Sequence, residues 1–322
     1  MRRCESVTAV DGRLYVLQLD YVTVFDLSTG EILAAGVDVD RIRGMLSDST
    51  YSVGGCKTIT SDGAGRPVLV EIGAAFAHVY DVTAGQASPF FAYRGGFRFN
   101  ADADPFPCPD CGYLMGAVVR ADSLKFYYRP RGSLVAGSGD YRSRAHGAMG
   151  VTTVDPSLDN NPRHTAMSGD TTFLEASTRT LEQIHYGTFV DRLTYTDGGF
   201  AIEEVHARFE EDAGGYERIT QLIGASDGNV IAIHEDRRDS TSVIRTRFPD
   251  GTLLETSALP VPPTASEYRV RAALYHRGAL YYTLSDYDGG YDTCRHWVCR
   301  RSDDGAFAFR RLEAGLFLPP FQ

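Results

Sequence analysis

The sequence predicts an all-β protein built from repeated four-stranded units. The first observation is a phrase of fixed chemistry, which occurs as VFDLSTGE at Val24–Glu31 and as VYDVTAGQ at Val79–Gln86. Weaker copies follow, and the glycines that close the copies are spaced 47 to 66 residues apart. These glycines are Gly30, Gly85, Gly132, Gly198, Gly251 and Gly305. A period of this size is typical of a repeat architecture.

The second observation is the series of short apolar runs around each copy. Runs such as RLYVLQLD (13–20) and NVIAIHED (229–236) are rich in Val, Ile, Leu and Tyr, and Asp-Gly or similar turns separate them. This composition favours β-hairpins. No segment shows the 3.6-residue apolar period of an amphipathic helix. We therefore expect four strands, A to D, in each unit, with the recurring phrase as the C–D hairpin.

Four-stranded units repeated radially are the blades of a β-propeller, in which each blade buries its faces against its neighbours. We expect one propeller domain over residues 1–322 with six antiparallel blades. A seven-bladed ring is the alternative, if the fourth unit contains two blades. The expected blades span about 5–39, 53–94, 96–141, 147–210, 216–259 and 268–318.

Composition narrows the classes of partner. The net charge is −10 and no basic block stands out, which argues against a nucleic acid. No stretch approaches the roughly 18 apolar residues of a membrane span. The N-terminal MRRCESVTAVDG lacks the apolar run of a secretory signal. We expect a soluble protein, intracellular or within a virion or another assembly.

The C–D turn of the sixth unit resembles the Asp-box of sialidase-like propellers, S-x-D-x-G-x-T-W. Ser302 and Asp304 fit this pattern and Phe309 stands for its Trp, while Ala306 and Ala308 replace its Gly and Thr. The first two units are more similar to quinoprotein or WD-type repeats, in which V-[FY]-D-x-x-[ST]-G is common. In the sialidase family the box is structural and lies away from the catalytic centre, so the resemblance implies a propeller without assigning a family.

A sialidase-like enzyme would also need an arginine triad, a Tyr–Glu nucleophile pair, an Asp acid and an early R-I-P motif. None of these stands in a recognisable motif here. We therefore expect a non-catalytic propeller that acts as a protein-interaction or structural subunit and uses its loop faces as docking surfaces. The alternative is a carbohydrate-binding or glycoside-hydrolysing propeller, with a glycan as its ligand.

One candidate docking site lies in the B–C loops of the fifth and sixth units. Tyr, Trp and Arg often carry the binding energy of protein interfaces. The candidate residues are Arg237, Arg238, Tyr287, Tyr291, His296 and Trp297. The competing interpretation is that Trp297, the single Trp, packs between blades and that the charges form a solvated turn.

Two weak metal-site candidates complete the set. Cys108 and Cys111 form a C-x-x-C in a long connection (101–112), and His164 in a second long connection (155–170) is a candidate third zinc ligand. A local disulfide and two free thiols are the alternatives. Three aspartates around two glycines could bind calcium, or they could form a solvated turn. These residues are Asp286, Asp288 and Asp292. We expect no other cofactor.

Overall fold

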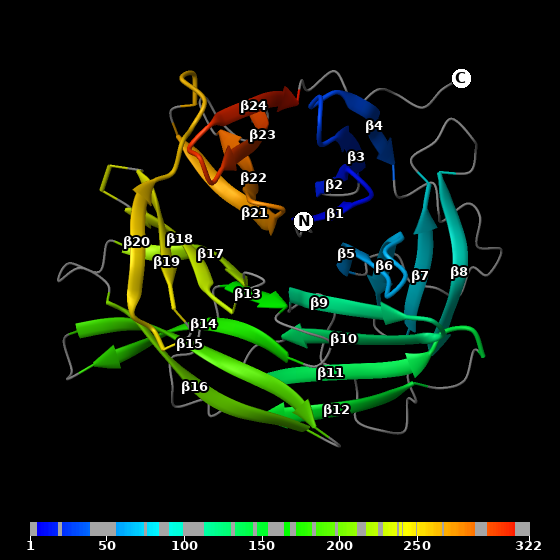
Figure 1. Ribbon diagram of the computed structural model, residues 1–322. Helices are drawn as coiled ribbons and strands as arrows, with labels where there is room; N and C mark the ends of the chain where they lie inside the picture. Colours follow the sequence, from blue (N-terminus) through cyan, green and yellow to red (C-terminus); the bar gives the residue numbers. More distant parts are fainter. Residues whose placement is uncertain are drawn as a thin grey trace. The chain divides into compact units, whose positions relative to one another are not determined.

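A computed structural model shows six four-stranded antiparallel sheets (Figure 1). The residues that it describes are 5–18, 21–38, 56–73, 76–83, 90–98, 113–129, 133–143, 147–153, 164–167, 172–181, 185–196, 199–210, 217–224, 228–236, 238–239, 241–248, 250–265, 267–286 and 295–312. None of them belongs to a helix that is long and apolar enough to cross a membrane. The chain divides into two compact units, and each unit contains three of the sheets.

The first unit contains blades 1 to 3. Blade 1 consists of β1 (Glu5–Val10), β2 (Arg13–Gln18), β3 (Tyr21–Asp26) and β4 (Ile32–Asp38). Blade 2 consists of β5 (Cys56–Ser61), β6 (Pro67–Ile72), β7 (Phe76–Val82) and β8 (Phe91–Arg98). Blade 3 consists of β9 (Tyr113–Arg120), β10 (Ser123–Arg129), β11 (Ser133–Asp140) and β12 (Ala148–Thr153).

The second unit contains blades 4 to 6. Blade 4 consists of β13 (His164–Met167), β14 (Thr172–Leu181), β15 (His185–Thr196) and β16 (Gly199–Glu210). Blade 5 consists of β17 (Glu217–Gly224), β18 (Val230–Asp236), β19 (Ser242–Arg247) and β20 (Leu253–Ala258). Blade 6 consists of β21 (Tyr268–His276), β22 (Ala279–Asp286), β23 (Arg295–Ser302) and β24 (Phe307–Leu312).

Within each unit, consecutive blades pack face to face and their first strands lie side by side. β1 contacts β5 and β5 contacts β9, as β13 contacts β17 and β17 contacts β21. Apolar clusters fill the spaces between blades 1 and 2, 2 and 3, 4 and 5, and 5 and 6. This arrangement confirms the predicted all-β propeller class. The six sheets are those of the described residues, so the blade number and the single domain stay predictions.

Burial explains the sequence pattern of the inner strands. All eight residues of β22 are buried, because β22 lies between β21 and β23 in the sheet and packs against blade 5 through the apolar cluster that the two blades share. The strand therefore reads as the nearly continuous apolar run ALYYTLSD instead of an alternating one. The fourth strand has one strand neighbour in its sheet, and in β20 every residue is at least partly exposed.

The Asp-Gly turns between the third and fourth strands form as the sequence predicts. In blade 1, Asp26 Oδ1 accepts hydrogen bonds from the N–H groups of Ser28 (2.8 Å) and Thr29 (2.9 Å). In blade 6, Asp304 Oδ1 accepts one from the N–H of Ala306 (3.1 Å), and Gly305 adopts φ +86°, which favours glycine. The Asp and Gly of the recurring phrase therefore shape these turns.

The structure corrects the expected limits of blades 2 to 4. The predicted boundary at Gly95–Gly96 lies inside β8, where a Cβ at Gly95 would overlap the carbonyl oxygen of Tyr141 in blade 3. Gly95 therefore permits close packing between blades 2 and 3 and does not end a blade. Blade 2 accordingly extends to Arg98.

The misplaced boundary also shifted the predicted blade 3 by one strand. The phrase that ends on Gly132 joins β10 to β11, so it is a B–C connection. β12, which we expected in blade 4, pairs with β11 of blade 3. The connection 101–112 therefore links blade 2 to blade 3, and residues 154–163 link blade 3 to blade 4, instead of joining the first two strands of a blade.

Candidate functional site

Among the described residues, four of the six large exposed apolar side chains belong to blades 5 and 6, and the other two are Leu33 and Tyr93 in blades 1 and 2. In blade 5, Leu253 and Leu254 at the start of β20 are 48% and 47% exposed, and Phe248, directly after β19, is also exposed. Leu254 is the extra residue of a β-bulge between Leu253 and Glu255, which interrupts the regular pairing of β20 with β19 at these leucines. An exposed edge strand with apolar residues can pair with another chain.

The outer part of blade 6 carries aromatic rings and arginines. Phe309 on β24 is 42% exposed and makes an edge-on contact with Trp297 on β23, at a ring-centroid distance of 5.6 Å. Phe307 lies beside it, 5.5 Å away between centroids. Arg311 lies over the Trp297 ring, 6.0 Å from its centroid, at the outer limit for a cation–π contact.

The structure separates two of the predicted docking residues that adjoin in sequence. Trp297 is 5% exposed and belongs to the apolar cluster between blades 5 and 6. His296 is on the opposite face of β23, where its Nδ1 lies 3.1 Å from Ser285 Oγ. Ser285 has no exposed surface, so this pair is not placed to attack a substrate.

The remaining predicted docking residues belong to loops. Arg238 is exposed in a turn, and its N–H donates to Asp236 Oδ1 (2.8 Å). Arg237, Tyr287 and Tyr291 lie outside the described residues. The loop site as a whole therefore stays a prediction.

The predicted metal sites also lie mostly outside the described part of the chain. Cys108, Cys111, Asp288 and Asp292 are not among the described residues. Asp286 ends β22 and is fully buried, while His164 begins β13. Within the described ranges, no group of three His, Cys, Asp or Glu side chains is placed to hold a metal ion.

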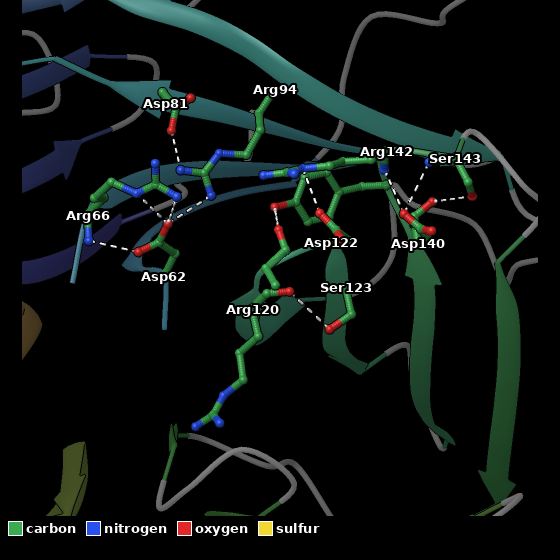
Figure 2. A network of polar contacts seen from close by, with 12 residues as sticks. Asp62, Arg66, Asp81, Arg94, Arg120, Asp122, Ser123, Asp140, Arg142 and Ser143 are labelled. Carbon is green, nitrogen blue, oxygen red and sulfur yellow. Dashed lines mark hydrogen bonds and ion pairs between the residues drawn. The ribbon is translucent and has the colours of Figure 1, made fainter. Parts of the chain in front are cut away.

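A buried ion-pair network joins the turn after β5 to strands β7 and β8 of blade 2 (Figure 2). The sequence analysis did not predict this network. Arg94 of β8 is inserted between Asp62, in the turn after β5, and Asp81 of β7. The Arg94–Asp62 distance is 2.9 Å, and the two side chains are only 6% and 2% exposed. Arg66, which is 56% exposed, adds a second ion pair to Asp62 at 2.9 Å.

Hydrogen bonds keep this buried network charged. Burial alone would raise the pKa of the Asp62 carboxyl, but the backbone N–H of Arg66 and the guanidinium of Arg94 outweigh burial and hold this pKa below its usual value. Burial would lower the pKa of Arg94, whereas its bonds to Asp81, Tyr141 and Asp62 raise it. Arg94 therefore stays a cation whose partners are supplied by the protein itself.

The network continues to blade 3 through the backbone. The N–H of Gly63 donates to the carbonyl of Val119 (2.9 Å), and Asp62 and Val119 form a parallel β-bridge. The hydroxyl of Tyr141 donates to the carbonyl of Ala121. We call Asp62, Asp81, Arg94 and Tyr141 the blade 2–3 clasp, because Arg94 bonds both the aspartates of its own blade and Tyr141 of blade 3.

A second buried polar group lies on the other face of blade 2. Tyr80 Oη is 3.2 Å from His78 Nδ1 and 3.3 Å from Glu71 Oε2. Burial lowers the pKa of His78 to about 4 and, together with Glu71, raises the pKa of Tyr80. At neutral pH His78 is uncharged and Tyr80 is protonated, and both are enclosed by the core between blades 1 and 2.

Sequence analysis missed the clasp because its members come from separate segments of the chain. It missed the second group because Glu71 lies opposite His78 only when β6 and β7 pair. Asp62, Asp81 and Arg94 come from three separate segments, and each alone resembles an ordinary turn or strand residue. One usable signal was Arg94 itself, a charge inside the otherwise apolar and aromatic FAYRGGFR. A buried charge in such a strand requires a partner.

Comparisons with known proteins show similarity in structure only. No family model and no curated protein matches the chain. The Dos1 propeller is 10% identical, with 94% of this chain and 68% of that chain covered at a TM-score of 0.45. A hypothetical selenium-binding protein from Sulfolobus tokodaii is 10% identical, with coverages of 90% and 87% and a TM-score of 0.42. The β-propeller domain of the Trilobed protease from Pyrococcus furiosus is 9% identical, with both chains covered to 96% at a TM-score of 0.39.

Proposed function

We propose that this chain is a non-catalytic β-propeller that serves as a protein-interaction or structural subunit of a larger assembly. The observation that carries the proposal is the exposed apolar surface on the outer strands of blades 5 and 6. Leu253, Leu254 and Phe309 are each more than 40% exposed, and each lies on a strand that has one strand neighbour within the described part of the chain. Large apolar patches and unpaired edges are what protein partners cover.

The buried polar groups support the same proposal. In the clasp, the charges of Arg94 and Asp62 are satisfied by each other and by neighbouring groups. His78 and Tyr80 are enclosed between blades 1 and 2. Groups with these contacts stabilise blades and have no access to a substrate.

Site-specific photo-crosslinking tests the proposal. A benzophenone amino acid at Leu254 should form a discrete adduct in extract from the source organism, and the same group at Asp122, an exposed acid in blade 3, should not. Excess wild-type protein should suppress the adduct, whereas excess Leu253→Asn/Leu254→Asn protein should not. The apolar edge would then be the docking surface.

Two results would contradict the proposal. One is an adduct that forms equally from Leu254 and Asp122, because a sticky surface and not a docking edge would then be responsible. The other is specific binding on a glycan array, or turnover of fluorogenic glycosides, by the folded protein. Either glycan result would favour the carbohydrate-directed alternative.

A further inference from the structure

The outer edge of blade 6 is basic, although the protein as a whole is acidic. Residues 295–312 contain five arginines and two aspartates, whereas the whole chain has a net charge of −10. The two aspartates are engaged at the β23–β24 turn. Asp303 Oδ2 accepts a hydrogen bond from the Tyr275 hydroxyl (2.7 Å), and Asp304 caps the turn through the N–H of Ala306 (3.1 Å). The arginines lie farther along the two strands.

Arginines flank this edge on both faces. Arg300 and Arg310 share one face of the β23–β24 hairpin, and Arg301 and Arg311 share the other, because side chains alternate along a strand. Arg300, Arg310 and Arg311 are exposed. Among the described residues, no carboxylate forms an ion pair with Arg300 or Arg311. An incoming anion therefore meets exposed guanidinium groups on either side of β24.

The backbone of β24 offers hydrogen bonds on the same edge. The N–H of Ser302 donates to the carbonyl of Ala306, which fixes the alternation of the β23–β24 ladder. In that alternation Ala308 and Arg310 bond to β23, while Phe307, Phe309 and Arg311 direct their N–H and C=O groups away from it. Within the described ranges β24 has β23 as its one neighbour in the sheet, so these groups face away from the sheet.

We propose that β24 is a docking strand for an acidic, extended peptide segment of a partner protein, which adds to blade 6 as a fifth strand. This inference rests on the proposed function and names the chemistry of one partner. The outward backbone groups select an extended chain, and the arginines select acidic side chains. Phe307 and Phe309 supply an apolar surface for the residues that alternate with the acids.

A peptide is favoured over a nucleic acid for two reasons. A single-stranded nucleic acid has no backbone N–H groups to complete the ladder of β24, so the outward carbonyl groups would stay unpaired. The net charge of −10 also repels a long polyanion, whereas a short acidic strand meets only the local basic edge.

A fluorescein-labelled peptide of four Glu-Val repeats is a suitable probe for fluorescence anisotropy. As a strand next to β24 it places Glu on the face that carries Arg300 and Arg310, and Val on the face that carries Phe307 and Phe309. We expect saturable binding that weakens as salt is raised. Arg300→Glu/Arg310→Glu should reduce the affinity by about tenfold or more, while Arg277→Glu in the β21–β22 turn of the same blade should not change it.

Modified peptides test the backbone contacts without altering the protein. The same peptide with alternate amides N-methylated keeps its charge and loses donors, and we expect it to bind about tenfold more weakly. A peptide of four Lys-Val repeats should not bind. The inference is overturned by equal binding of the N-methylated peptide, by unchanged binding to Arg300→Glu/Arg310→Glu, by absence of binding to the Glu-Val peptide, or by tighter binding of oligo(dT). None of these outcomes affects crosslinking at Leu254, so the proposed function is tested separately.

Discussion

Blade 2 and blade 6 both carry arginines near an outer strand, but the surroundings of these arginines differ. Arg94 of blade 2 is buried and contacts Asp62 and Asp81 of its own blade. Arg300 of blade 6 is exposed, and no carboxylate of the described residues pairs with it. An arginine on a blade stabilises the fold where carboxylates of the same chain pair with it. Where no such carboxylate is present, the arginine is available to a partner.

Removal of Arg94 should give the largest effect on stability. Arg94→Leu leaves the buried Asp62 without its main cation, which should lower the free energy of unfolding by about 3–5 kcal/mol. Urea denaturation measures this change. Arg66→Ala is the matched control, because Arg66 bonds the same carboxylate from an exposed position and should cost less than about 1 kcal/mol. Equal effects of the two variants would show that the clasp does not depend on burial.

A side chain at Gly95 should strain the same clasp. The added Cβ of Gly95→Ala would overlap the Tyr141 carbonyl, so either blade 2 or blade 3 must move. We expect a loss of about 1–3 kcal/mol, measured by thermal denaturation. Gly63→Ala is a control, since its Cβ would meet only the flexible Arg120 side chain, at 3.3 Å. A wild-type melting temperature for Gly95→Ala would contradict the close packing of the two blades.

Acid should weaken blade 2 through His78. Burial lowers its pKa from 6.5 to about 4. Between these two pH values the imidazole is protonated in the unfolded chain and neutral in the folded chain. The resulting stability is complete above pH 6.5 and is lost as the pH falls towards 4. Between pH 7 and pH 5 the loss is about 2 kcal/mol.

His78→Phe should remove this part of the pH dependence in urea denaturation. The Phe ring can keep the stack on Phe76, whose present centroid distance to His78 is 4.4 Å. Phe76→Leu is the control, because it alters the same stack without removing a titratable group, and its cost should be similar at both pH values. An undiminished pH dependence in His78→Phe would assign the acid sensitivity to other groups.

Charge reversal at Arg300 should give the smallest effect on stability. Arg300 is exposed and lacks an ion pair in the described part of the chain, so Arg300→Glu should change the free energy of unfolding by less than about 0.5 kcal/mol. Thermal denaturation of this variant beside Arg94→Leu tests the comparison directly. A loss as large as that of Arg94→Leu would mean that Arg300 also has a structural role.

Local chemistry made the propeller class and most of the turns predictable. An Asp followed by a Gly between two apolar runs is sufficient for the turns at Gly30, Gly251 and Gly305, since the capping bonds lie within a few residues. The role of Gly95 was not predictable in this way. Its neighbour Tyr141 comes from the next blade, and only the packed structure distinguishes close approach from a chain break.

The candidate sites were less predictable than the fold for the same reason. Trp297 was singled out by its residue type, but its position in β23 buries it between blades. The exposure of Leu253, Leu254 and Phe309 follows from their place on outer strands. The recurring phrase predicted that these residues follow a C–D turn, but residue type and spacing did not indicate which apolar side chains of that strand stay exposed.

The clasp between blades 2 and 3 has a consequence for synthesis on the ribosome. Asp62 and Gly63 leave the ribosome before their backbone partner Val119, which follows roughly one blade later. At about 5–20 residues per second this delay lasts several seconds. During that interval the nascent blade 2 lacks its partner surface, so the apolar residues that pack against blade 3 stay exposed until blade 3 emerges.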